Sequence, residues 1–352
     1  MDSNNIILPL ILIGLGLLFY KFFFPILNKN YPRLLIDDQF NKPQAFHESA
    51  IPMVGGIVLL LLLIITYLYF LIFKNVVFFQ YFSFCSLLFL LGFLDDLKVN
   101  IKPKVRLVLM IIFIFALVKY NNFYLEKTGI KFLNDWISSS EIFSLLFIGL
   151  CFLFVINGSN LIDGYNGLLG IHSLIILLNL FLINFFSSNF NLANLIFFQI
   201  IALITFLSFN FPKAKIFLGD GGSYFLGAFI AITAVETSIA NPSISPFYFC
   251  ILLFYVFFEV FFSFFRKLIK EKKSPIHPDK KHLHMLLYQL LLKHNNDKQK
   301  SNYYVSIIIN VIYLVLTIPA VIMMQNGMFC KYYSLVFFFI YIFSYKKVHG
   351  KI

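Results

Sequence analysis

Long apolar runs separated by short polar segments extend along most of the chain. Eleven runs approach about 20 residues, the length that a helix needs to cross a hydrocarbon core of about 30 Å. Because the runs are continuous rather than alternating, they favour helices over a barrel of strands. The runs cover residues 6–27, 51–73, 76–94, 103–119, 141–156, 171–187, 191–209, 222–238, 247–265, 303–323 and 329–345. The pattern predicts an all-α, polytopic transmembrane helical bundle of about 11 spans, forming a single integral membrane domain over residues 1–352.

Composition supports the same class of protein. The chain has 352 residues, of which 60% are hydrophobic and only 12% are charged, whereas a soluble domain carries about 25% charged residues. The four cysteines form no C-x-x-C pair, so neither a disulfide framework nor a zinc site is indicated.

Basic residues lie mainly on one side of the predicted bundle. The loops on that side, with the helix start at 103–106 and the tail after 345, hold 22 of the 28 Lys and Arg residues. By the positive-inside rule this side is cytoplasmic, which puts the N-terminus outside. The net charge of +12 then reflects topology and an anionic lipid or substrate, so the lipid bilayer is expected as a partner and nucleic acid is not.

Four unusually polar segments all fall on this cytoplasmic side. They are GFLDDLKVNIKPKVRL (92–107), NGSNLIDGYNGLLG (157–170), FNFPKAKIFLGDGGSYFLG (209–227) and KKSPIHPDKKHLHMLLYQ (272–289). The predicted spans depend on hydropathy alone and not on these segments. Polar loops with only a structural role would be expected on both sides of the membrane. The agreement indicates an active site assembled at one membrane edge.

Adjacent carboxylates stand out in the first segment. Asp95 and Asp96 point about 100° apart on a helix, so one can touch a metal or substrate while the other acts as a base or orients a partner. The alternative is a solvated helix end paired with Lys98 or Arg106.

Asp220 lies in FLGDGGSYFLG, where glycines leave backbone N–H groups open at a helix start. Phosphates favour this combination, and a carboxylate there can hold Mg²⁺ against them. The alternative is a plain N-cap, for which Asp is a preferred residue.

The last polar segment contains His282 and His284 among lysines. Their spacing is poor for zinc but suits donation of hydrogen bonds to phosphate oxygens. Glu259 falls inside a predicted span, as either an intramembrane functional group or a structural partner. Phe217, three residues before Asp220, stands where a base would stack. Together these features describe phosphoryl transfer from a soluble, nucleotide-activated donor to a lipid acceptor.

The four segments, in this order, resemble those of the polyprenyl-phosphate N-acetylhexosamine-1-phosphate transferases, glycosyltransferase family 4. This family includes phospho-N-acetylmuramoyl-pentapeptide translocase and the enzymes that initiate O-antigen, common-antigen and teichoic acid synthesis. FHESAIPMVGG (46–56) resembles the N-terminal segment of the family. The resemblance implies that a UDP-N-acetylhexosamine gives its sugar 1-phosphate to undecaprenyl phosphate with release of UMP. It also implies attack at the β-phosphorus and an active site at the cytoplasmic face of a bacterial inner membrane.

The resemblance also assigns roles by position. Asp95, Asp96 and Asp163 match catalytic or donor-site acids, and Asp220 matches the Mg²⁺ ligand, with Mn²⁺ as an alternative ion. The matches to substrate-binding positions are Asn160 and Asn166 in the nucleotide-side loop, Asn210 and Phe217 near the uracil, and His282 and His284 near the diphosphate. A homodimer is an open alternative to a monomer.

Two departures from the family pattern matter. Asn166 stands where many members have a second acid, so the metal is expected to rest mainly on Asp220. SPIHPDKKHLH lacks three consecutive histidines, which favours the O-antigen or common-antigen type over the muramoyl-pentapeptide translocase. The sugar is not fixed by the sequence: GlcNAc is the default, and FucNAc and QuiNAc compete with it.

The sequence disfavours two other functional interpretations. A transporter or flippase of lipid-linked sugars is expected to show related halves and broken helices at mid-membrane, but the polar groups cluster at one face and no internal repeat is found. An inactive structural homologue is disfavoured because Asp95, Asp96, Asp163 and Asp220 all persist.

Overall fold

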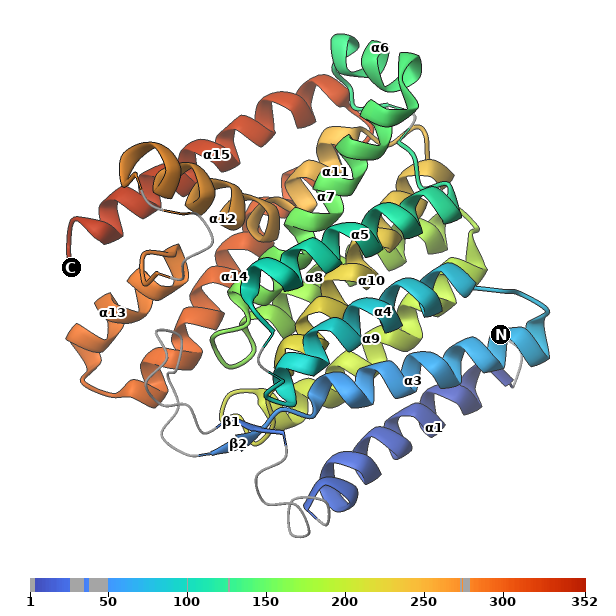
Figure 1. Ribbon diagram of the computed structural model, residues 1–352, viewed down its shortest axis with the longest axis horizontal. Helices are drawn as coiled ribbons and strands as arrows, with labels where there is room; N and C mark the ends of the chain where they lie inside the picture. Colours follow the sequence, from blue (N-terminus) through green and yellow to red (C-terminus); the bar gives the residue numbers. More distant parts are fainter. Residues whose placement is uncertain are drawn as a thin grey trace.

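A computed structural model describes residues 4–25, 35–37, 50–99, 101–125, 127–272, 274 and 279–352, and it shows a bundle of helices (Figure 1). The helices are α1 Asn4–Leu18, α3 Gly55–Tyr69, α4 Phe79–Asp96, α5 Pro103–Asn121, α6 Lys131–Ser139, α7 Glu141–Ile162, α8 Leu168–Phe186, α9 Phe190–Asn210, α10 Gly219–Ala240, α11 Pro246–Leu252, α12 Phe254–Phe265, α13 Leu283–Asn295, α14 Lys298–Ile322 and α15 Gly327–His349. Two short strands, β1 Ile36–Asp37 and β2 Ile51–Pro52, pair in antiparallel fashion.

The helical membrane bundle predicted from hydropathy is confirmed. Within the described residues, eight helices are long and apolar enough to cross a membrane, and a bent pair makes up to nine. Each of the eleven predicted ranges overlaps one of these helices, the bent pair, α1 or α5. α1 has a shorter apolar stretch, and α5 carries three basic residues within 19. The exact count of eleven spans and the orientation stay predictions.

The predicted span 247–265 is a broken helix, and whether it crosses the membrane as one span stays a prediction. It consists of α11 and α12, which bend by 76° relative to each other at Leu253. At the bend, the Tyr313 hydroxyl donates to the Leu252 carbonyl oxygen. Beyond it, α12 comes so close to α7 that a Cβ on Gly158 would lie 1.7 Å from the Val256 oxygen. Tertiary contacts with α14 and α7 therefore support the break, which contains neither Pro nor Gly.

Two further helices lie where the sequence suggested only loops. α13 occupies part of the predicted cytoplasmic loop 266–302. α6 lies on the opposite side of the chain's predicted topology and exposes Phe132 and Trp136. Both are shorter than a membrane span, so a search for long apolar runs misses them.

α10 forms the centre of the bundle. In its most apolar 18-residue window 78% of the residues are buried inside the protein, against 17% for α15. It packs against α4, α7, α3 and α8. The first turn of α10 meets the last turn of α4 at one end of this central helix. These segments carry Asp220 and the acidic pair, and the side chains of Asp95 and Asp220 are partly exposed there.

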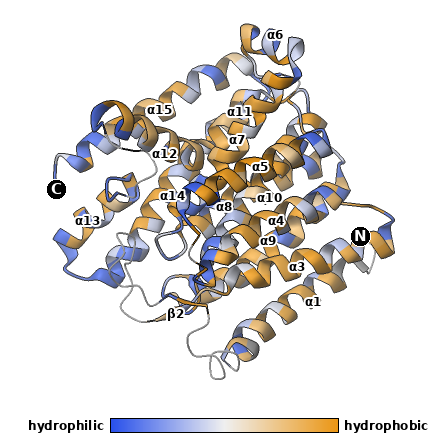
Figure 2. Ribbon diagram, viewed as in Figure 1, coloured by the Kyte–Doolittle hydropathy of each residue, from blue (hydrophilic) through white to orange (hydrophobic). Residues whose placement is uncertain are grey.

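The loop before α10 is fixed to β2 and α3. Phe217 donates its backbone N–H to the Pro52 oxygen at 2.8 Å, and its own oxygen accepts from Gly55 at 2.9 Å. Residues 46–49 of the predicted N-terminal motif lie outside the described residues. Figure 2 shows the long helices largely hydrophobic, with hydrophilic residues gathered around β2, the neighbouring loops and α13.

Candidate active site

Asp96 joins the end of α4 to the start of α10. Its two carboxylate oxygens accept hydrogen bonds from the backbone N–H groups of Asp220, at 2.8 Å, and Gly221, at 2.9 Å. Gly219 has φ +80°, and a Cβ there would lie 2.6 Å from Asp96 Oδ2. Only glycine fits such a position without strain. Asp96 thus occupies the anion-binding N-terminus of α10, and it positions the turn that carries Asp220.

Arg106 lies between two acids from different helices. Its Nη1 atom donates to Asp95 Oδ2 and, at 3.1 Å, to Asp220 Oδ2. The guanidinium carbon lies 5.9 Å from the centre of the Tyr224 ring. In the sequence, Arg106 figured only in the alternative interpretation, in which it pairs with the acids at a solvated helix end and the acids have no catalytic role. The structure instead makes it part of the cluster, because it bridges Asp95 to the proposed metal ligand.

Asn160, on α7, orients Asp220 from the other side. Its amide nitrogen donates to Asp220 Oδ1 and to Ser223 Oγ, each at 2.9 Å. The predicted contact of Asn160 with a nucleotide stays a prediction, since this nitrogen already serves the carboxylate. Both oxygens of Asp220 are therefore contacted by protein donors, one by Asn160 and the other by Arg106.

Asp163 follows the last residue of α7 and lies close to the same acids. Burial, together with the neighbouring carboxylates of Asp220 and Asp96, raises the pKa of the Asp163 carboxyl well above its ordinary value. Like charges gathered in a poorly solvated place disfavour ionisation. A cation bound in the cluster would offset this repulsion, so the electrostatics of the site favour cation binding.

Asn166, which stands where the resembling family often has an acid, connects the loop after α7 to the loop before α10. Asn166 donates through its side-chain amide to the Pro212 oxygen at 3.0 Å. Its backbone N–H donates to Asn302 Oδ1 at 2.8 Å. The side chain is therefore held at the rim of the 210–218 loop, and its role toward a nucleotide stays a prediction.

Asn210 is buried and uses both ends of its amide within the protein. Its oxygen accepts from the Gly167 N–H at 2.8 Å, and its nitrogen donates to the Ile216 oxygen at 2.9 Å. These bonds fix the shape of the loop that leads to Phe217. A direct contact of Asn210 or Phe217 with uracil stays a prediction.

The two histidines lie in a second cluster built around Glu259 of α12. Glu259 Oε1 is 3.1 Å from His282 Nδ1 and accepts from the Leu283 N–H at 3.0 Å. Glu259 Oε2 accepts from the Tyr341 hydroxyl at 2.7 Å. His282 and Glu259 are only 2% and 1% exposed. Glu259, whose role the sequence left open, thus anchors the start of α13.

His284 is a buried member of the histidine segment. The ring is fully buried, and its Nδ1 lies 3.2 Å from the Tyr255 hydroxyl. Burial lowers the pKa of His284 to about 4. Burial therefore favours the uncharged imidazole at neutral pH. Within the described part of the chain, its buried Nε2 has no hydrogen-bond partner, so donation to a substrate stays a prediction.

Tyr165 links the two clusters. It follows Asp163 by two residues, and its ring centre lies 5.7 Å from that of His284 and 5.4 Å from that of Tyr288. The loop after α7 therefore contacts α13 directly, and the histidine cluster is a neighbour of the acidic one.

The donor set fits a metal ion that is shared with a substrate. Among the described residues, no group of three or more His, Cys, Asp or Glu side chains could hold an ion alone. Asp95 and Asp220 nevertheless converge on one cationic group. Mg²⁺ commonly uses one or two carboxylates and takes its other ligands from phosphates and water. The two acids fit this pattern.

The comparisons with known proteins give a consistent result. The model of the family described as "Glycosyl transferase family 4" matches residues 78–238, a range that contains all four acids of the cluster. The chain is 36% identical to phospho-N-acetylmuramoyl-pentapeptide-transferase of Dictyoglomus turgidum, over 66% of this chain and 75% of that protein. It is 33% identical to undecaprenyl-phosphate alpha-N-acetylglucosaminyl 1-phosphate transferase of Thermotoga maritima, over 68% of each. The Escherichia coli O157:H7 protein of that second name is 26% identical over 68% of this chain and 66% of its own length.

Proposed function

The chain belongs to glycosyl transferase family 4, and on that premise we propose that it transfers an N-acetylhexosamine 1-phosphate from a UDP-sugar to undecaprenyl phosphate. The observation that carries the proposal is the convergence of Asp95, Asp220 and Arg106 from three helices. Relatives whose names specify sugar 1-phosphate or muramoyl-pentapeptide transfer support it. The glycan it starts is an O-antigen or a similar cell-surface polymer, and the reaction takes place at the cytoplasmic face of a bacterial inner membrane.

In the proposed reaction a phosphate oxygen of undecaprenyl phosphate attacks the β-phosphorus of the donor. The bond from that phosphorus to the bridging oxygen breaks, UMP leaves, and a lipid-linked sugar diphosphate forms. Most of the catalysis in such a transfer is positioning and charge stabilisation. Since Asp96 is occupied by two backbone N–H groups, we assign it to positioning and Asp95 to contact with the acceptor.

Asp220 and Asp95 would hold Mg²⁺, which supplies a Lewis acid for the diphosphate charge when it is bound. Arg106 provides a second cation beside the same oxygens, and its planar fork suits phosphate recognition. Asn160 keeps Asp220 in one orientation. The turn at Gly219–Gly221 stays fixed through Asp96.

The experiment measures UMP release by membranes that contain the protein, Mg²⁺, undecaprenyl phosphate and a UDP-N-acetylhexosamine. Asp220→Asn and Asp95→Asn should each abolish release without loss of protein. The matched control is Asp135→Asn, on the exposed surface of α6, which should keep wild-type activity. If both site variants stay near wild-type activity, the mechanism is wrong; formation of the lipid-linked product separates a transferase from a flippase.

The sugar is the finer part of the proposal. Relatives named for GlcNAc 1-phosphate transfer and for muramoyl-pentapeptide transfer are similarly close, so the comparisons do not separate these donors. GlcNAc remains the default, with FucNAc and QuiNAc as competitors. A panel of UDP-sugars in the same assay decides among them.

A further inference from the structure

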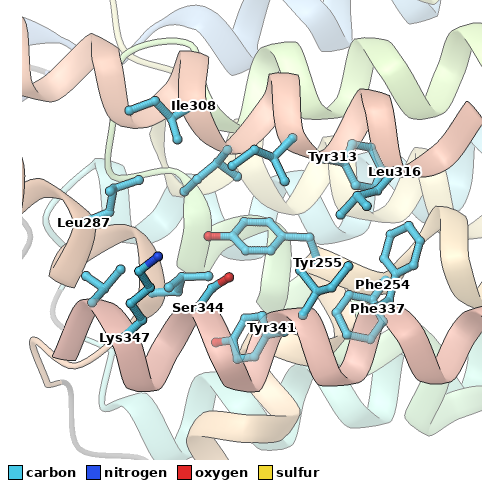
Figure 3. A pocket seen from close by; sticks show the side chains of 15 residues that line it. Phe254, Tyr255, Leu287, Ile308, Tyr313, Leu316, Phe337, Tyr341, Ser344 and Lys347 are labelled. Carbon is cyan, nitrogen blue, oxygen red and sulfur yellow. The ribbon is translucent and has the colours of Figure 1, made fainter. Parts of the chain in front are cut away.

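An elongated cavity lies on the side of α12 that faces α13, α14 and α15 (Figure 3). Its volume is about 220 Å³. At one end lie Phe254, Phe337 and Leu316, and at the other lie Ser344 and Lys347. For comparison, an apolar cavity of about 150 Å³ in another protein stays dry and binds benzene. The cavity is large enough for a segment of hydrocarbon chain.

The three tyrosine hydroxyls along the walls are already engaged. The hydroxyl of Tyr255 pairs with His284, that of Tyr341 donates to Glu259, and that of Tyr313 donates to the Leu252 oxygen. These rings therefore present their apolar faces to the cavity. Along these rings a polar ligand would lose its hydration without gaining partners, whereas a hydrocarbon chain would not.

One end of the cavity is cationic. Lys347 lines it, and Lys346 and His349 belong to the same last turn of α15. Lys293, near the end of α13, lies within hydrogen-bonding distance of the Lys351 oxygen, which brings a further basic side chain to this end of the molecule. An apolar cleft with a basic rim is complementary to an amphiphile that has a hydrocarbon tail and an anionic head.

We propose that this cavity binds one hydrocarbon chain of an anionic membrane phospholipid, with the lipid phosphate at Lys347. The undecaprenyl acceptor is a poorer match for it, because its phosphate must reach Asp95 and Asp220. α12 packs against α7, the helix that carries Asn160, on its other side. In Figure 1, α15 runs along one edge of the molecule, well away from α4.

The bound hydrocarbon chain would contact two tyrosines that are hydrogen-bonded to the histidine cluster. Tyr255 and Tyr341 both line the cavity, and their hydroxyls pair with His284 and Glu259 respectively. A chain packed against these two rings would restrict their movement. The lipid would then stabilise the segment that begins α13.

The test is native mass spectrometry of the purified full chain, titrated with dioleoylphosphatidylglycerol or dioleoylphosphatidylcholine. Ser344→Phe fills the cavity, and Ser334→Phe makes the same change on α15 outside its lining. We expect one tightly held phosphatidylglycerol in the wild type and in Ser334→Phe, and its loss in Ser344→Phe. Lys347→Gln should weaken phosphatidylglycerol binding about fivefold and leave phosphatidylcholine binding unchanged. Lys331→Gln, an exposed position near the other end of α15, should leave the binding of both lipids unchanged.

Several results would overturn the proposal. One is equal lipid retention by Ser344→Phe, Ser334→Phe and the wild type. Another is equal affinity of the wild type for the two headgroups. Displacement of phosphatidylglycerol by undecaprenyl phosphate, together with a raised acceptor KM in Ser344→Phe, would assign the cavity to the acceptor instead. Because the binding readout needs no turnover, failure here leaves the proposed transferase reaction standing.

Discussion

At the scale of single residues, the acids of the site could be identified from the sequence, but their cationic partner Arg106 could not. Asp95, Asp96 and Asp220 stand beside glycines or beside each other in otherwise apolar surroundings, and such placement is costly without a purpose. Arg106 carries no comparable signal. A basic residue at a cytoplasmic helix start is what the positive-inside rule predicts anyway, so only the geometry distinguishes it from its neighbours.

Arg106 gives the first prediction. Arg106→Gln should lower kcat about 10²–10³-fold, the usual cost of removing one preorganised donor from a charged site. Since Asp95 and Asp220 then lose a competing cation, half-maximal activity should require less Mg²⁺. A Mg²⁺ titration of UMP release measures both effects. Lys104→Gln, an exposed neighbour on the same helix, should change neither, and wild-type kinetics of Arg106→Gln would contradict the assignment.

The histidines show a limit of reading single residues in order. His282 and His284 follow several lysines, and nothing in this local sequence predicts that they are buried. Their burial depends on Glu259, which precedes His282 by 23 positions and lies in an apolar run. The pairing of Glu259 with His282 depends on how α12 and α13 pack, and no local sequence pattern predicts it.

At the scale of elements, Glu259 should hold the start of α13. Glu259→Gln keeps the side-chain size but removes the charge that serves His282, Leu283 and Tyr341. We expect a lower melting temperature and a marked loss of UMP release, because a displacement of about 1 Å in a site can cost on the order of 100-fold in rate.

The matched control for this substitution is Glu236→Gln. Glu236 is also embedded in the bundle, where it accepts hydrogen bonds from Gln80 and Tyr81, far along α10 from Asp220. It should lower the melting temperature without a comparable loss of activity per folded molecule. Equal losses of activity in the two variants would show that Glu259 acts only through general stability.

α13 also carries a pH-dependent contribution to stability through His284. Its pKa is about 4 in the folded protein, whereas an unfolded histidine titrates near pH 6.5. The unfolded state therefore binds more protons below about pH 6.5, and the free energy of unfolding falls as the pH drops toward 4. The loss is about 2 kcal/mol at pH 5.

Thermal unfolding at pH 7.5 and pH 5 checks this sign. His284→Phe should show a smaller drop in melting temperature between the two pH values than the wild type does. His294→Phe alters an exposed histidine near the end of the same helix, and it should keep the wild-type dependence. The prediction is refuted if His284→Phe and the wild type follow the same course.

Hydropathy located the long helices but not the details that depend on packing between them. The run at 247–265 is uniformly apolar, so it reads as one span. The bend at Leu253 rests on the Tyr313 hydroxyl and on the close approach at Gly158, both of which come from other helices. The cavity beside α12 is likewise a property of four helices together and has no signature in any one of them.

At the scale of the whole molecule, orientation is the feature that the charge pattern predicts most directly. The loops on one side hold 22 of 28 basic residues, and the acidic cluster forms at the helix ends on that same side. α15 offers a matched pair of positions, because Lys331 and Lys346 are both exposed and lie near its opposite ends. Positive-inside topology puts Lys331 outside and Lys346 in the cytoplasm.

Labelling of intact cells with a membrane-impermeant maleimide tests this arrangement. Lys331→Cys should be labelled from outside, and Lys346→Cys should be labelled only after the membrane is opened. The parent protein, with its four native cysteines, gives the background for both. The reverse pattern would place the acidic cluster at the outer face, where a cytoplasmic UDP-sugar does not reach it, and it would overturn the orientation while leaving the fold intact.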